Sequence, residues 1–145
     1  MKLTQLLRII LITILVTPHV SHADNTEVTA WTQQVLLATL SAKYDRTAND
    51  LLSIRRNYTN NAWEALSGFF SSEIQEIRNR KLTLNPYPLT PATISDEGVF
   101  SGIKYWRINQ SFALHELNMT LGFSVIVIKA NNPPYLIQSI NIVKN

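Results

Sequence analysis

The sequence predicts an α+β protein in which N-terminal helices pack on one face of a curved antiparallel sheet. In the first half of the exported part, apolar residues recur at intervals of three and four, as in amphipathic helices. The last third contains β-rich runs that are separated by turn residues. Helices followed by consecutive strands favour an α+β arrangement. We expect three helical segments and about four strands.

Residues 1–23 are predicted to be a secretory signal peptide. Lys2 and Arg8 give the start a positive charge, and Ile9–Val16 is an unbroken aliphatic run. Small residues at Ser21 and Ala23 suit cleavage after Ala23. A retained membrane anchor is the alternative, but the apolar run is short against the roughly 20 residues that span a bilayer. We therefore expect one periplasmic domain, residues 24–145, with no stable membrane span after processing.

The composition of this domain excludes several kinds of partner and site. Residues 24–145 hold eleven basic and ten acidic residues, a net charge of +1, so nucleic acid is not an expected partner. The chain has no cysteine, which excludes disulfide scaffolds and cysteine-based zinc sites. Its stability must come from the hydrophobic core.

The helical half contains one clear stripe and two capping patterns. Apolar residues recur with helical spacing through 26–44, whereas 45–58 fits either a short helix or a packed loop. Asn61 with Glu64 predicts the start of a second helix, and Ser72 with Gln75 predicts a third. Trp63 in the second helix is expected to anchor the core.

The second half is expected to form strands. Three prolines between 86 and 91 end the helical region, and Asp96–Gly98 has the composition of a turn. The predicted strands are 99–112, 120–130 and 135–143, with a turn at 131–134. In the last strand Leu136, Gln138, Ile140 and Ile142 should share one face. In the middle strand Ile126 and Ile128 oppose the apolar face, so both faces should be covered there.

No residue pattern predicts a catalytic, cofactor or metal site. His115 is the single histidine after residue 23, and its neighbour Glu116 should point to the opposite face. Asp96 with Glu97 could form an acid pair or a Ca²⁺ site, but a solvated turn explains them. Glu73 with Glu76 fits a helix N-terminus. Arg55–Arg56 fits a solvated surface, and Trp106 fits the core.

Three segments resemble the DotI/IcmL family of type IVB secretion systems, which is related to TraM of conjugative plasmids. They are Tyr58–Leu66, Gly102–Ile108 and Pro133–Ile140, the last with Gln138 in place. Ala62 stands where the family often has glycine. The family also carries a retained transmembrane helix, in contrast to the cleavable signal predicted here.

The resemblance implies a cone like that of nuclear transport factor two, with a curved antiparallel sheet around helices. It also implies a non-enzymatic periplasmic component or assembly factor of a type IVB secretion apparatus, with protein components of that complex as partners and self-association left open. The alternative is a ligand-binding protein or an isomerase- or dehydratase-like enzyme of the same fold. Such a site would need polar groups inside the cone, which Tyr44, Tyr58, Tyr105 and Asp45 could supply.

Overall fold

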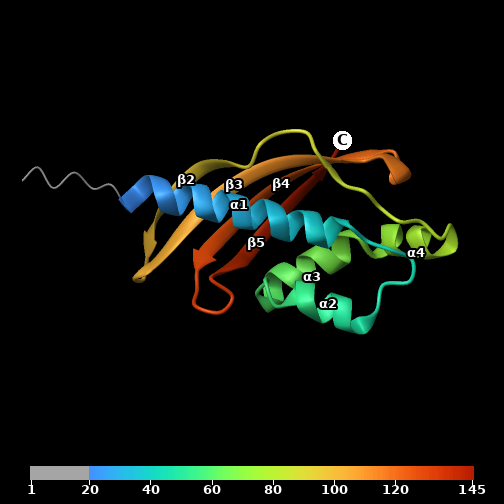
Figure 1. The fold of residues 1–145 in the computed structure, drawn as a ribbon, viewed down its shortest axis with the longest axis horizontal. Helices are drawn as coiled ribbons and strands as arrows, with labels where there is room; N and C mark the ends of the chain where they lie inside the picture. Colours follow the sequence, from blue (N-terminus) through green and yellow to red (C-terminus); the bar gives the residue numbers. More distant parts are fainter. Residues whose placement is uncertain (1–19) are drawn as a thin grey trace, which may run out of the picture.

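The computed structural model describes residues 20–145, with side chains from Ala23 onward. Four helices precede the sheet, and Figure 1 shows α1 lying along one face of the strands with α2, α3 and α4 grouped near its C-terminal end. The α+β prediction is confirmed, with four helices in place of three. The helices are α1 (Val20–Leu40), α2 (Ala48–Arg55), α3 (Asn60–Phe69) and α4 (Ser71–Asn79).

The strands form one antiparallel sheet in the order β1-β3-β4-β5, and β2 also pairs with β3. A 3₁₀ turn, His115–Leu117, joins β3 to β4. Each strand of this meander pairs with its neighbour in the sequence, except that β1 and β2 both pair with β3. The strands are β1 (Tyr87–Pro88), β2 (Thr93–Phe100), β3 (Ile103–Leu114), β4 (Met119–Lys129) and β5 (Tyr135–Lys144).

The core lies between α1 and the inner face of the sheet. The predicted apolar face of β4 is confirmed, because its alternate residues from Leu121 to Val127 are all buried. Trp106 on β3 is fully buried and packs edge-on against Tyr135, whose other neighbour is Trp31 of α1. Three aromatic rings therefore fix α1 to the strands.

The starts of two helices differ from the capping predictions. The N-cap residue of α3 is Thr59, whose side chain accepts a hydrogen bond from the Ala62 amide. Phe70 precedes α4 without a side-chain cap, and the Ser72 hydroxyl instead donates to Glu73. The first prediction was wrong because Thr59, which is bound to β5, caps α3 two residues before Asn61. The second was wrong because Phe70 alone separates α3 from α4, so α4 begins before Ser72 can cap it. The open question at 45–58 resolves as a helix, which Thr47 caps together with Asp50.

The prediction of a turn at Asp96–Gly98 was wrong, because these residues lie within β2. The turn is Ser101–Gly102, where both residues have positive φ, as a two-residue hairpin requires. Gly98 has a different role: a side chain there would meet the Tyr105 ring at 3.1 Å. Tyr105 covers the backbone of its cross-strand neighbour. The predicted strand 99–112 is consequently two strands, joined by this hairpin.

The predicted face of the last strand was wrong in its first half. A bulge opposite Ile126 and Val127 shifts the register of β5, because Ser139 pairs with Ile126 and Ile137 with Val127. Gln138 is the extra residue, and a bulge reverses the alternation of side chains. Tyr135 and Ile137 therefore point into the core before the bulge, as Ile140 and Ile142 do after it.

The outer face of the sheet carries no second layer among the described residues (Figure 1). Ile126 and Ile128 lie on this face and are only partly buried, so the prediction that both faces are covered was wrong. Side chains of the neighbouring strand lie beside them: Ile126, Ile128, Tyr105 and Ile103 together line an open hollow on this face.

The beginning of α1 is attached to β3 by two side-chain contacts. The Trp106 Nε1 donates to Asn25 Oδ1 at 2.9 Å, and Lys104 Nζ lies 3.6 Å from Asp24 Oδ2. Most of the predicted signal peptide, residues 1–19, lies outside the described residues, and the predicted cleavage site after Ala23 falls in the first turns of α1. Within residues 20–145, no helix is both long and apolar enough to span a membrane.

Candidate interaction surface

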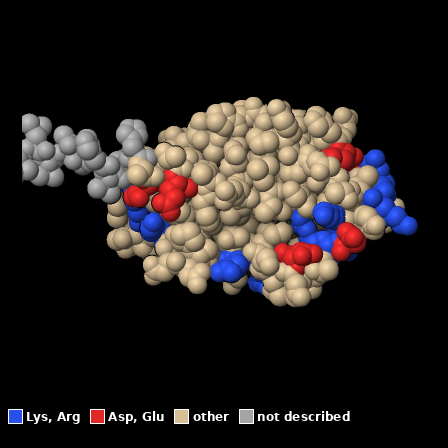
Figure 2. Space-filling view, in the orientation of Figure 1, with Lys and Arg blue, Asp and Glu red and all other residues tan. Residues whose placement is uncertain are grey.

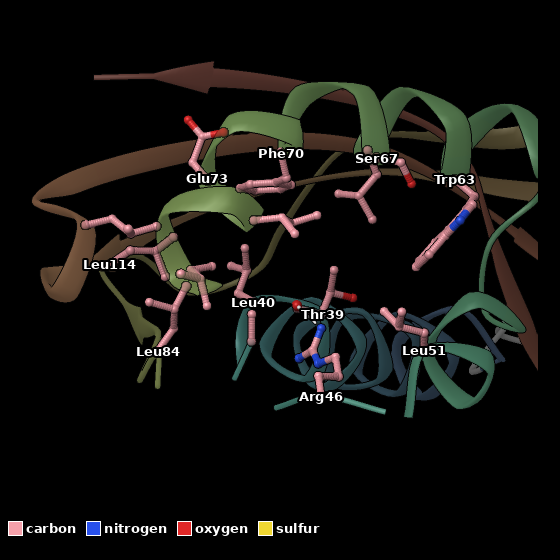
Figure 3. Close-up of a pocket in the computed structure, with 15 residues that line it drawn as sticks. Thr39, Leu40, Arg46, Leu51, Trp63, Ser67, Phe70, Glu73, Leu84 and Leu114 are labelled. Carbon is pink, nitrogen blue, oxygen red and sulfur yellow. Dashed lines mark hydrogen bonds between the residues drawn. The ribbon is translucent and has the colours of Figure 1, made fainter. Parts of the chain in front are cut away.

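A small, partly open apolar cavity of about 90 Å³ lies beside the helices (Figure 3). Trp63 and Phe70 line it from α3 and its end, and Thr39 and Arg46 face them from the opposite side. Ligand pockets usually measure about 300–1,000 Å³. The cavity is therefore small for a substrate, and Trp63, which was predicted to be a core anchor, is half-buried at its wall.

Most polar groups around this cavity are already paired. The hydroxyls of Thr39 and Tyr58 lie 2.6 Å apart, and burial raises the pKa of Tyr58 far above its usual value. The Arg46 guanidinium donates to carbonyl groups at the end of α1, the shortest bond being 2.6 Å to Ser41. Figure 3 shows the Glu73 carboxylate directed away from the cavity centre. Of the hydroxyl-bearing and charged side chains that line the cavity, Ser67 alone makes no hydrogen bond within the described residues.

Glu73 is buried, and its carboxylate links α4 to β5 through a contact with Lys144. Its carboxylate accepts hydrogen bonds from the Ser72 hydroxyl at 2.8 Å and from Lys144 Nζ at 3.3 Å. Burial alone would raise the pKa of Glu73, but these bonds and one from its own backbone N–H outweigh burial and lower the pKa. Glu76 instead pairs with Arg80 on the surface of α4. The two carboxylates thus have separate structural roles.

The remaining residues considered for chemistry are dispersed. His115 is exposed in the 3₁₀ turn, and the adjacent Glu116 accepts hydrogen bonds from the backbone and side-chain nitrogens of Asn85. Burial would raise the pKa of Glu116, but its hydrogen bonds lower it. Arg55 and Arg56 are exposed and donate to asparagine side chains.

The polar groups proposed for an enzyme of this fold do not meet. Tyr44 and Asp45 are exposed after α1, Tyr58 is buried against Thr39, and Tyr105 lies on the outer face of the sheet, where its hydroxyl donates to Asp96 at 3.4 Å. Within residues 20–145, no three His, Asp or Glu side chains are grouped so that they could hold a metal ion.

The two edges of the sheet differ in whether their backbone is covered. At β5, the Thr59 amide donates to the Ile137 carbonyl at 3.0 Å, and the Ile137 amide donates to the Asn57 carbonyl at 2.9 Å. The Thr59 hydroxyl also donates to the Gln138 carbonyl at 3.0 Å. The segment that leads into α3 therefore closes this edge at Ile137 and Gln138, like a short parallel strand.

At β2 the outer edge is open. Among the described residues, β2 pairs with β3 alone, and no other backbone hydrogen bond to residues 94–100 is formed. The tip of the β2–β3 hairpin exposes three apolar side chains: Val99 at 67%, Phe100 at 77% and Ile103 at 47%. An open edge with exposed apolar residues is a typical site for pairing with another chain.

Beside this edge, the outer face of the sheet is hollowed. Apolar side chains form the floor and one wall, and Asp96, Arg107 and Gln138 form the polar margin. On the opposite face, seen in Figure 2, charged side chains gather toward the two ends and leave the centre and top uncharged. The hollow is lined by Asp96, Phe100, Ser101, Ile103, Tyr105, Arg107, Ile126, Ile128 and Gln138.

A family model for the inner-membrane complex component of type-IV b secretion systems, DotI/IcmL, matches residues 2–135. The chain belongs to this family. The predicted family relationship is thereby confirmed. No curated protein sequence matches the chain significantly.

Solved structures of this family share the fold at low sequence identity. The periplasmic domain of DotI is 13% identical with a TM-score of 0.69, covering 82% of this chain and 94% of that one. A periplasmic fragment of TraM is 13% identical with a TM-score of 0.70, covering 83% and 97%. An IcmL-like type IV secretion protein from Legionella pneumophila is 12% identical with a TM-score of 0.59, covering 84% and 94%.

Proposed function

We propose that the domain is a non-enzymatic periplasmic part of a type IVB secretion complex and acts through protein–protein contacts. The observation that carries this proposal is the open β2 edge with its exposed apolar tip, in a domain where most polar groups near the helical cavity are paired. Membership in a family of secretion-complex components supplies the kind of assembly. Protein components of that complex are the expected partners.

Export is proposed to proceed through the segment 1–23. Cleavage after Ala23 would leave Asp24 and Asn25 as the first residues, and both are held by β3 through Lys104 and Trp106. The processed domain would thus begin at a residue that already belongs to the fold. N-terminal sequencing of the protein from the envelope fraction should begin at Asp24, whereas intact Met1 in the membrane pellet would support a retained anchor.

The functional proposal is tested in cells of the source organism that lack the native copy. The variants His115→Ala, Asp45→Asn and Tyr44→Phe remove exposed groups that could transfer protons. We expect each variant to restore secretion to the wild-type level and to co-purify with secretion-complex proteins from the envelope. A variant that folds and co-purifies normally but abolishes secretion would indicate an active site and contradict the proposal.

A further inference from the structure

We infer that the free edge of β2 binds an extended segment of a different protein, in which basic and apolar side chains alternate. The segment would add one strand to the sheet. This inference rests on the proposed function, because it names the surface and the chemistry of the contact that the function requires.

The backbone of β2 is available for such pairing. Its eight residues, Thr93–Phe100, are hydrogen-bonded on one side to β3 over most of their length. On the other side no described segment covers them, whereas Asn57–Thr59 covers Ile137 and Gln138 of the edge strand β5. Alternate backbone groups of an edge strand point outward, and an added strand satisfies them.

The two carboxylates at the middle of β2 select a basic partner. Asp96 and Glu97 are exposed, and neither has an ion pair within 4.0 Å among the described residues. Their side chains point to opposite faces, because Asp96 is opposite Arg107 on the outer face and Glu97 is opposite the buried Trp106. A basic residue, Arg107, stands opposite Asp96, whereas the residue opposite Glu97 is uncharged, so Glu97 is the acid without a basic cross-strand neighbour. Opposite charges on neighbouring strands stabilise their pairing.

The same charges disfavour a second copy of this chain as the occupant. The midpoint of Thr93–Phe100 falls between Asp96 and Glu97. An antiparallel pair of β2 strands related by a two-fold axis sets each residue opposite one whose side chain lies on the same face, so the two registers nearest that midpoint place Asp96 opposite Asp96, or Glu97 opposite Glu97, of the second copy. Like charges in directly opposite positions are destabilising. The occupant is therefore a different sequence.

The hollow on the outer face accommodates the apolar side chains of the segment. Gly98 has no side chain, and its neighbours on this face are Tyr105 and Phe100. A residue of the added strand opposite Gly98 would point to the outer face and lie beside these two rings. The next residue along the segment, opposite Glu97, would point to the other face and carry the basic group. Alternation of basic and apolar residues follows from this geometry.

The test uses two synthetic eight-residue peptides, one alternating lysine and valine and the other glutamate and valine. The protein is the ¹⁵N-labelled chain as it accumulates in cells after export. We expect the lysine peptide to shift the amide signals of residues 94–100 and to slow their hydrogen exchange, with no comparable effect from the glutamate peptide. Glu97→Lys should weaken lysine-peptide binding about fivefold, while the matched variant Glu64→Lys on α3 should not.

Other results overturn the inference. Shifts confined to β5, equal binding of both peptides, or no binding at all would each contradict it. Slow exchange of the β2 amides without peptide, together with dimers that form as concentration rises, would show that a second copy occupies the edge. If these results occur while the wild-type protein still co-purifies with secretion-complex proteins, the proposed function stands and only the inference about β2 fails.

Discussion

The two edges of the sheet differ in how much of their backbone is covered. At β5, Asn57–Thr59 supplies three hydrogen bonds to the strand, and Lys144 at its end is bound by Glu73. At β2, no described segment pairs with the outer side, and the hairpin tip leaves Phe100 77% exposed. Proteins commonly protect exposed edges by bulges and charges. Here β2 has both a bulge and two acids, yet it keeps an apolar tip.

This difference indicates where stability and function reside. The closed edge joins the helices to the sheet, so changes there should cost folding free energy. The open edge contributes little to the core, so changes there should leave folding intact and alter binding. Because stability is assigned to one edge and binding to the other, the effect of a substitution at one edge can be compared with that of a matched substitution at the other.

The largest expected effect contrasts two aromatic residues of one hairpin. Trp106→Ala removes a fully buried ring and its hydrogen bond to Asn25, and should lower the free energy of unfolding by about 3–5 kcal/mol. Phe100→Ala should change it by less than about 0.5 kcal/mol, because that ring is exposed. Urea unfolding of both variants measures the difference. Similar losses for the two would show that the hairpin tip belongs to the core.

A smaller effect is expected at the closed edge. Thr59→Ala removes both the cap of α3 and the hydrogen bond to the Gln138 carbonyl, and should cost about 1 kcal/mol. The control is Thr93→Ala at the start of β2, whose hydroxyl makes a longer bond of 3.4 Å to Asn109. This control should cost less than about 0.5 kcal/mol. If Thr59→Ala unfolds at the wild-type urea midpoint, the closed edge is not maintained by this residue.

The smallest effect is a dependence of stability on pH at the end of β5. Because the pKa of Glu73 is lowered in the folded protein, its ionised form stabilises the fold above the ordinary value of 4.5, and this contribution is lost as pH falls below it. The contribution is small, since the Lys144 side chain is 53% exposed. Glu73→Gln should flatten the slope of the unfolding temperature against pH between about 3 and 5, whereas Glu64→Gln should retain the slope.

The sequence predicted the fold class and the family better than it predicted the edges. Periodicity located α1 and the apolar face of β4, because a 3.6-residue or two-residue repeat reflects burial directly. It misplaced the hairpin, since Asp96–Gly98 has the composition of a turn but occupies an edge strand, where acids face water and Gly98 makes room for Tyr105. The dipeptide Ser101–Gly102 was the signal that could have located the turn.

The candidate surface could not be predicted from sequence for a related reason. Whether an edge is open depends on segments far away in the chain, as when Thr59 pairs with Ile137. The bulge at Gln138 likewise depends on the register with β4. Its local trace is a change of apolar spacing, from Tyr135 and Ile137 before it to Ile140 and Ile142 after it, and the adjacent Leu136 and Val143 obscure this change.

The central claim is that the open edge of β2, and not a catalytic group, carries the function. The most direct measurement is secretion by cells whose single copy of the protein is Glu97→Lys, compared with cells carrying Glu64→Lys. Both acids are exposed, so both variants should fold with unchanged urea midpoints. We expect Glu97→Lys to reduce secretion and co-purification with the complex, whereas Glu64→Lys should leave both at the wild-type level. Wild-type secretion by both variants would contradict it.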